Sequence, residues 1–156
     1  MRKRNSSGHP QGVECWEMDV GISAVNTEVD TGHDLPPTGI LVGYALDVIT
    51  AEVTGTTKTM DIGTLTGETG ADPDGLFDAV DCSATGLKLP SLASGAQTRG
   101  ALMREDEGGG VLIPKHYDVA SVAAKSISRT LGSNNWAEFE GRLLLWIQPI
   151  PSRGLT

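Results

Sequence analysis

The sequence predicts an all-β protein, an antiparallel β-sandwich of the jelly-roll type with an extended N-terminal arm and long loops. Several segments alternate apolar and polar residues with the period of two that is typical of a strand. The 156 residues include 20 Gly and 8 Pro, many of them clustered between these segments. Aromatic residues account for only 4%, so the core must be built from aliphatic side chains on short elements.

The chain divides into an arm, residues 1–12, and a single β-sandwich domain, residues 13–156. The arm MRKRNSSGHPQG has no apolar period. This indicates either a disordered, flexible segment or an extended one. The remaining length fits one ordinary domain that needs neither a disulfide nor a metal ion to fold.

Strands are predicted in the first half of the domain. Residues 13–29 alternate in places and predict one long strand or two short ones. After the proline-rich loop TGHDLPPTG, residues 40–53 are rich in β-branched side chains, with the even positions as the candidate core face. Residues 56–65 alternate in the same way, with Met60 and Ile62 on the apolar side. A Thr-Gly-Thr turn separates the two segments, so we predict that they form a hairpin.

The second half is more varied. Residues 76–81 fit one turn of helix or a short packing segment, and residues 83–92 contain a short strand. The Gly-rich and acidic stretch 93–110 predicts an exposed loop or a segment ordered by a partner. Residues 117–131 contain much Ala, as in a helix, but their Ser, Thr and Val content favours a strand. Residues 137–151 are apolar on both sides in the middle, which is typical of a central or covered strand.

Charge and hydropathy exclude two kinds of partner. With 20 acidic and 12 basic residues the net charge is -8, which repels phosphate backbones, so we expect no nucleic acid. No stretch approaches the ~20 apolar residues of a membrane helix, so we expect no membrane partner. The start also lacks the apolar segment of a secretory signal, so we expect a cytosolic protein or one carried inside something assembled there. The basic residues Arg2, Lys3 and Arg4 could contact an acidic surface or form a solvated terminus.

The acidic loop invites a calcium hypothesis. Asp72 and Asp74, with Glu68 and Asp78 nearby, offer several oxygen ligands at close spacing. The segment lacks the twelve-residue pattern of a calcium loop, and Pro73 fixes the backbone between the two aspartates. A turn stabilised by aspartate side chains is therefore the preferred interpretation over a cation site.

No other cofactor, metal or disulfide is predicted. Cys15 and Cys82 lie 67 positions apart without a CxxC pattern and are expected to be free thiols. His9, His33 and His116 have no ligand at metal-binding spacing, although residues distant in sequence could still meet.

Catalytic motifs are also missing, so we expect no enzyme. The sequence has no GxSxG, and its triple glycine at 108–110 lacks the Lys and Ser/Thr of a phosphate-binding loop. Trp16, Trp136 and Trp146 could provide a sugar-stacking platform or an interface anchor, with core packing as the alternative.

Residues 34–87 resemble a pattern found in small bacteriophage virion proteins. In these proteins an entry strand after Leu-Pro leads to a hairpin, a hydrophobic-Asp-hydrophobic-Gly-Thr strand and an Asp-rich DPDG loop. The matched residues are Leu35, Pro36, Met60, Asp61, Ile62, Gly63, Thr64, Asp72, Pro73, Asp74 and Gly75. The closing strand GRLLLWIQPIP also fits the family. The resemblance implies a β-sandwich with a structural place in the particle and no enzymatic residues.

Among virion roles, size, acidity and exposed extensions favour a capsid cement or decoration protein on the capsid exterior, assembled in the host cytoplasm. Its expected partners are the major capsid protein and itself, as a trimer before a dimer. The expected interface residues are Arg2, Lys3, Arg4, Trp16, Trp136 and Trp146. The alternatives are a tail or fibre protein, a carbohydrate-binding module that uses the tryptophans, and an unrecognised hydrolase.

Overall fold

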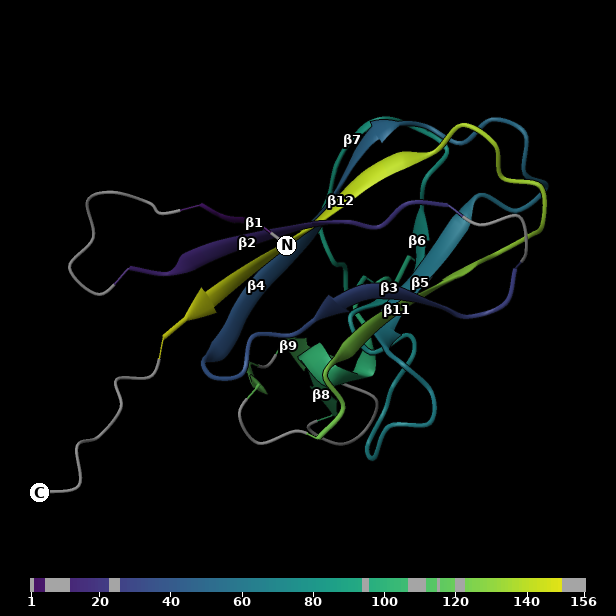
Figure 1. Ribbon diagram of the computed structural model, residues 1–156. Coiled ribbons are helices and arrows are strands. Elements are labelled where there is room, and N and C mark those ends of the chain that lie inside the picture. Colours follow the sequence, from purple (N-terminus) through teal and green to yellow (C-terminus); the bar gives the residue numbers. More distant parts are fainter. Residues whose placement is uncertain are drawn as a thin grey trace, which may run out of the picture.

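A computed structural model gives the fold as two antiparallel sheets and a small hairpin (Figure 1). It describes residues 2–4, 12–22, 26–93, 96–106, 112–114, 116–119 and 123–149. The first sheet contains β1 (Arg2–Arg4), β2 (Glu14–Asp19), β4 (Ile40–Thr50), β7 (Gly86–Lys88), β10 (Tyr117–Asp118) and β12 (Glu140–Gln148). The second contains β3 (Val29–Asp34), β5 (Thr59–Thr64), β6 (Phe77–Asp81) and β11 (Ser126–Leu131). A short 3-10 helix, η1 (Ala101–Met103), leads into the hairpin of β8 (Arg104–Asp106) and β9 (Leu112–Pro114).

The prediction of an all-β antiparallel protein is confirmed. In the first sheet the order is β1-β2-β12-β4-β10, and β7 pairs with β4 beside β10. In the second sheet the order is β3-β11-β5-β6. Among the described residues, no helix is long and apolar enough to cross a membrane.

Strand pairing is nested along the chain. When β1 and the segment β8–β10 are set aside, the first strand, β2, pairs with the last, β12. The second strand, β3, pairs with the second-last, β11. The series continues with β4 paired to β7 and ends with β5 paired to β6. The connections from β2 to β3, β4 to β5, β6 to β7 and β11 to β12 each lead from one sheet to the other.

The core consists mainly of aliphatic side chains from both sheets. The described core cluster includes Leu46 and Leu143 from the first sheet and Ile62 and Ile127 from the second. Each such side chain contributes about 1.5–3 kcal/mol on full burial. As predicted, β12 is central, since it lies between β2 and β4. Its odd positions are buried.

The predicted hairpin between residues 40–53 and 56–65 is wrong. Strand β4 pairs with β12 along nearly its whole length, whereas β5 pairs with β11 and β6 in the other sheet. Residues 51–58 therefore connect two sheets instead of turning within one. A hairpin needs only local contacts, but β12 is a longer apolar partner for β4 than β5 is, and it is supplied from far along the chain.

A β-bulge explains why the predicted core face of β4 is only partly correct. Tyr44, Leu46 and Val48 are buried as expected, but at the start of the strand the buried residue is Leu41. The register shifts between Trp146 and Ile147 of β12, which leaves one extra residue in β4. Such an extra residue changes which side chains face the core.

Three further segments can be compared with the secondary structure predicted for them. Residues 76–81 contain strand β6 and no turn of helix. The described parts of 117–131 are strands β10 and β11, as preferred, whereas residues 120–122 lie outside the description. The stretch 96–106 is not an exposed loop, because Met103 is fully buried and Arg99 forms a bridge with Phe77.

Within the predicted arm, Arg2–Arg4 pair with β2 as an edge strand, so this part of the backbone is extended and joined to the sheet. Residues 5–11 and the side chains of Arg2, Lys3 and Arg4 lie outside the description.

Candidate interaction surface

Trp136 is a core residue and not a surface anchor, which corrects the prediction that it contributes to an interface. Its side chain is only 4% exposed and packs edge-to-face on Phe139, with ring centroids 5.5 Å apart. The indole Nε1 donates a hydrogen bond to the Thr57 carbonyl oxygen at 3.1 Å. The connection 51–58 and the segment before β12 close over the ring, so it cannot meet a partner.

The other two tryptophans lie on opposite faces of the first sheet. Trp16 is paired with Leu145 and packs against the core. Trp146 is half-buried and is paired with Cys15 and Gly43, so it belongs to the outer face. Because no two of the three rings share a surface, the predicted sugar-stacking platform is not formed.

The DPDG segment forms a tight turn packed on β5. The Asp72 carbonyl oxygen accepts hydrogen bonds from the amides of Thr64 at 2.8 Å and Gly75 at 3.0 Å. In return, the Asp72 amide donates to Thr64 Oγ1 at 2.8 Å. A Cβ atom on Gly63 would lie only 2.0 Å from the Asp72 carbonyl oxygen. The matched Gly-Thr and Asp-Pro-Asp-Gly motifs are therefore two halves of one backbone contact.

The two aspartates of this turn repel each other. Burial raises the pKa of Asp72 to about 6, and the neighbouring Asp74 carboxylate adds to the rise. The Arg104 guanidinium opposes it. Across the described residues no set of three or more His, Cys, Asp or Glu side chains is arranged to hold a metal ion.

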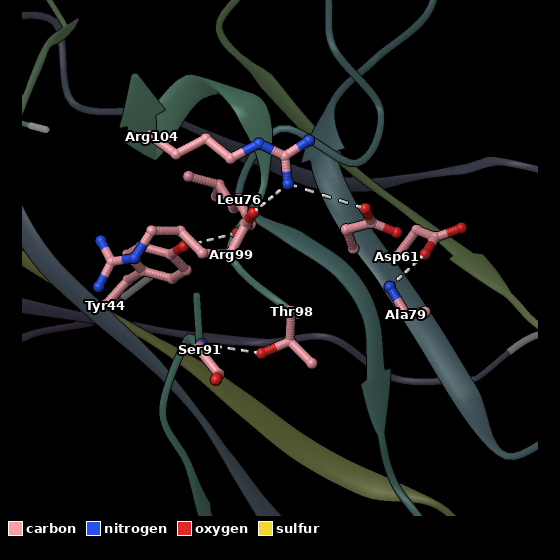
Figure 2. Close-up of polar contacts among 9 residues, drawn as sticks. Tyr44, Asp61, Leu76, Ala79, Ser91, Thr98, Arg99 and Arg104 are labelled. Carbon is pink, nitrogen blue, oxygen red and sulfur yellow. Dashed lines mark hydrogen bonds and ion pairs between the residues drawn. The ribbon is translucent and has the colours of Figure 1, made fainter. Parts of the chain in front are cut away.

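Two arginines that the sequence analysis missed, Arg99 and Arg104, lie close to Tyr44 and Leu76 (Figure 2). Arg104 donates to the Arg99 carbonyl oxygen at 2.7 Å and lies 4.0 Å from the Asp78 carboxylate. The Arg99 guanidinium lies 5.7 Å from the ring centre of Tyr44, whose hydroxyl donates to the Leu76 carbonyl oxygen at 2.7 Å. The only available signal was that both arginines stand in a Gly-rich, acidic stretch, which does not reveal their partners.

A second missed residue is Glu52, a buried carboxylate in the connection between the sheets. One oxygen accepts from the Thr54 amide at 2.7 Å, the Thr54 hydroxyl at 2.5 Å and the Gly55 amide at 3.0 Å. The other accepts from the amides of Ala137 at 3.0 Å and Glu138 at 3.2 Å. Glu52 thus joins two loops and is a structural group, not a catalytic one.

The remaining predicted groups do not assemble. Cys15 and Cys82 form no disulfide with each other, and Cys82 is buried. Burial raises the pKa of Cys82 to about 12, so its thiol stays protonated and unreactive at neutral pH. His33 lies on β3 and His116 immediately before β10, in different sheets, whereas His9 is outside the described residues.

The outer face of the first sheet has a pocket and exposed apolar side chains. The pocket, of about 300 Å³, is lined by Asp19, Gly21, Ile49, Phe139, Glu140, Gly141 and Arg142. Ile49 on β4 is 43% exposed, Leu87 on β7 is 54% exposed and Leu89 just beyond β7 is 63% exposed. Leu87 is paired with Asp47, so Ile49 is its diagonal neighbour on the same face. Large apolar side chains that gather on one face indicate a surface for binding another molecule.

No protein-family model, no curated protein and no solved structure matches this chain.

Proposed function

We propose that this protein is a structural component of a bacteriophage particle, a cement or decoration protein that binds the outside of the head and bridges neighbouring major capsid subunits. The proposal includes a jelly-roll fold and self-association on the particle, as a trimer before a dimer. A tail or fibre protein is the second virion role.

The observation that carries the proposal is the nested strand pairing. The first strand pairs with the last, and the pairing continues inward to a central hairpin while the chain crosses between two sheets, which supports the jelly-roll part of the proposal. Jelly rolls are frequent among viral capsid domains, and lectin domains also use them. Because the three tryptophans lie apart and form no sugar-stacking platform, the virion role is better supported than a lectin role.

The distribution of polar groups also favours binding over catalysis. Both carboxylate oxygens of buried Glu52 accept hydrogen bonds from loop amides. On the outer face, by contrast, Ile49 and Leu87 are large apolar side chains exposed to solvent. A protein that clamps neighbours needs such a contact surface.

Electron cryo-microscopy of purified particles that contain the protein tests the proposal. We expect density on the head exterior that accommodates the two sheets, located at symmetry axes or between capsid subunits. Leu87→Asp should reduce the occupancy of this density, because it places a charge in the contact surface. Val13→Asp is the control, since Val13 is also exposed (38%) but lies before β2.

Density in the tail would replace the head role by the second virion role. Absence of the protein from purified particles, with the folded protein found free in the lysate, would overturn the proposal. The symmetry of the density tests self-association separately, and single copies that do not touch one another on the head would contradict that part.

A further inference from the structure

The outer-face pocket lies where strands β2, β12 and β4 come together at one end of the first sheet. Asp19 is the last residue of β2, Glu140 is the first residue of β12 and Ile49 is the second-last residue of β4. The pocket of about 300 Å³ is large enough for one long side chain of a partner, although small for a drug-sized ligand.

A β-bulge shapes this pocket. The register between β12 and β4 shifts at Glu140 and Gly141, which are paired with Thr50 and Val48. Ile49 is the extra residue, and its side chain is 43% exposed although Val48 beside it is buried. Bulges redirect side chains and are frequent next to functional sites. The sheet therefore presents an isoleucine at the rim of a polar pocket.

The charges around the pocket are unbalanced. Arg142 lies 3.5 Å from the Asp19 carboxylate and is paired in register with Asp47 on its other side. Glu140 adds a third carboxylate, which accepts a hydrogen bond from the Thr50 hydroxyl at 3.1 Å. Among the residues that line the pocket, two carboxylates thus stand beside one guanidinium, and the Asp19 side chain is 84% exposed. A cationic group would be attracted here.

One further cation lies behind the pocket. The Arg129 guanidinium reaches the back of Gly21, where its Nε donates to the carbonyl oxygens of Val20 and Gly21. Arg129 is only 7% exposed and does not line the pocket, so it is separated from any occupant by the backbone.

We propose that this pocket binds a basic, extended segment of a partner protein, with a lysine or arginine side chain between Asp19 and Glu140. An apolar residue next to it in the segment would pack on Ile49 and Leu87, which are diagonal neighbours on the same face. The inference depends on this geometry alone and not on the proposed virion role.

The test uses a capped pentapeptide that alternates leucine and arginine, and a matched peptide with glutamate at the arginine positions. Amide NMR spectra of the full chain report binding at Gly21, Ile49 and Gly141. We expect the arginine peptide to shift these signals and the glutamate peptide to leave them unchanged. The affinity should fall as salt is added.

Variants locate the site. Glu140→Gln should weaken binding of the arginine peptide about fivefold, in line with a partly exposed charge contact. Glu105→Gln removes an equal charge from exposed Glu105 on β8, outside the pocket, and should change nothing. The same spectra verify that each variant is folded.

Equal shifts with both peptides, binding of the glutamate peptide alone, or shifts that Glu140→Gln and Glu105→Gln affect equally would overturn the inference. So would pocket signals that move with protein concentration, because the occupant would then be a second copy. No particle is used, so a failure here is distinguishable from absence of the protein from virions.

Discussion

Glu52 and Asp72 are acidic residues in connections of the same protein, but their pKa values shift in opposite directions. Burial alone raises the pKa of Glu52, yet hydrogen bonds from Thr54, Gly55 and Glu138 outweigh this effect and hold the pKa at about 2. For Asp72, burial and the Asp74 carboxylate together raise the pKa to about 6. Several backbone amides donate to the Glu52 carboxylate, whereas burial and the neighbouring Asp74 carboxylate outweigh the backbone hydrogen bond that the Asp72 carboxylate accepts from Asp74.

The difference shows what stabilises each loop. The connection at Glu52 depends on an ionised side chain that satisfies amides from two segments. The turn at Asp72 depends on the backbone, because the Asp72 carbonyl oxygen accepts hydrogen bonds from the amides of Thr64 and Gly75. The Asp72 carboxylate is repelled by that of Asp74. Removing the side chain should therefore damage the first loop and relieve the second.

The largest effect is expected from Glu52→Ala. The amides of Thr54, Gly55, Ala137 and Glu138 would lose their acceptor, and unsatisfied buried donors are costly. We expect a loss of about 4 kcal/mol in the free energy of unfolding, measured with urea. Glu138→Ala is the control, because its side chain is exposed. Equal losses for the two variants would contradict the role of the Glu52 carboxylate.

Gly63→Ala should have the next largest effect, because it attacks the turn through its backbone. The added Cβ would lie 2.0 Å from the Asp72 carbonyl oxygen, so the turn must move. We expect a loss of about 3 kcal/mol in the free energy of unfolding. At Gly67, whose φ is +101°, an added Cβ has nothing within 4 Å, so Gly67→Ala should cost only about 1 kcal/mol. A larger loss for Gly67→Ala than for Gly63→Ala would contradict the interpretation of the turn as a backbone contact.

Trp136→Phe tests how much the Trp136 ring contributes to the packing of the loop that contains Glu52. It removes the hydrogen bond from Nε1 to the Thr57 carbonyl oxygen and part of the contact with Phe139. A loss of about 1.5 kcal/mol in the free energy of unfolding is expected. Trp146→Phe, on the outer face, should cost less, and the two variants can be compared by thermal unfolding. A larger loss from Trp146→Phe would mean that the outer face carries more packing than the structure indicates.

The smallest effect is a change in pH dependence. The folded pKa of Asp72 lies above its ordinary 3.8, so ionisation destabilises the fold at pH 7 and this penalty vanishes as the pH falls through about 6 toward 4. Glu52 has a folded pKa below its ordinary 4.5, so its contribution is complete above pH 4.5 and is lost as the pH falls toward 2. Urea unfolding at pH 7, 5 and 3 measures both effects.

Asp72→Asn should slightly stabilise the protein at pH 7 and remove the gain between pH 7 and 5. It should leave the loss below pH 4.5 unchanged, because that loss belongs to other carboxylates whose folded pKa is lowered, Glu52 foremost, with Glu28, Glu68 and Asp81. If the variant is destabilised at pH 7 instead, the Asp72 side chain would be a favourable part of the turn.

Sequence patterns located most strands but not their partners. The alternation around Met60 and Ile62 appears in the structure as predicted, because side-chain period is a local property. The hairpin between β4 and β5 was wrong because pairing depends on the best complement anywhere in the chain. The bulge in β4 opposite Trp146 and Ile147 of β12 could not be predicted either, since it arises from the register of two strands.

For the candidate surface, the sequence alone pointed to tryptophans and to the basic start of the chain. Burial decided otherwise for Trp136, and only the tertiary structure brought Asp19, Ile49 and Glu140 together around one pocket.

By itself the sequence determined the all-β class, the acidic charge and the turn motifs, because these depend on composition and on neighbours along the chain. The tertiary structure decided the nested pairing, the opposite environments of Glu52 and Asp72 and the pocket on the first sheet. Each of these depends on which distant backbone amides, carboxylates and strand edges lie within a few ångströms of one another, and such distances exist only after the sheets have formed.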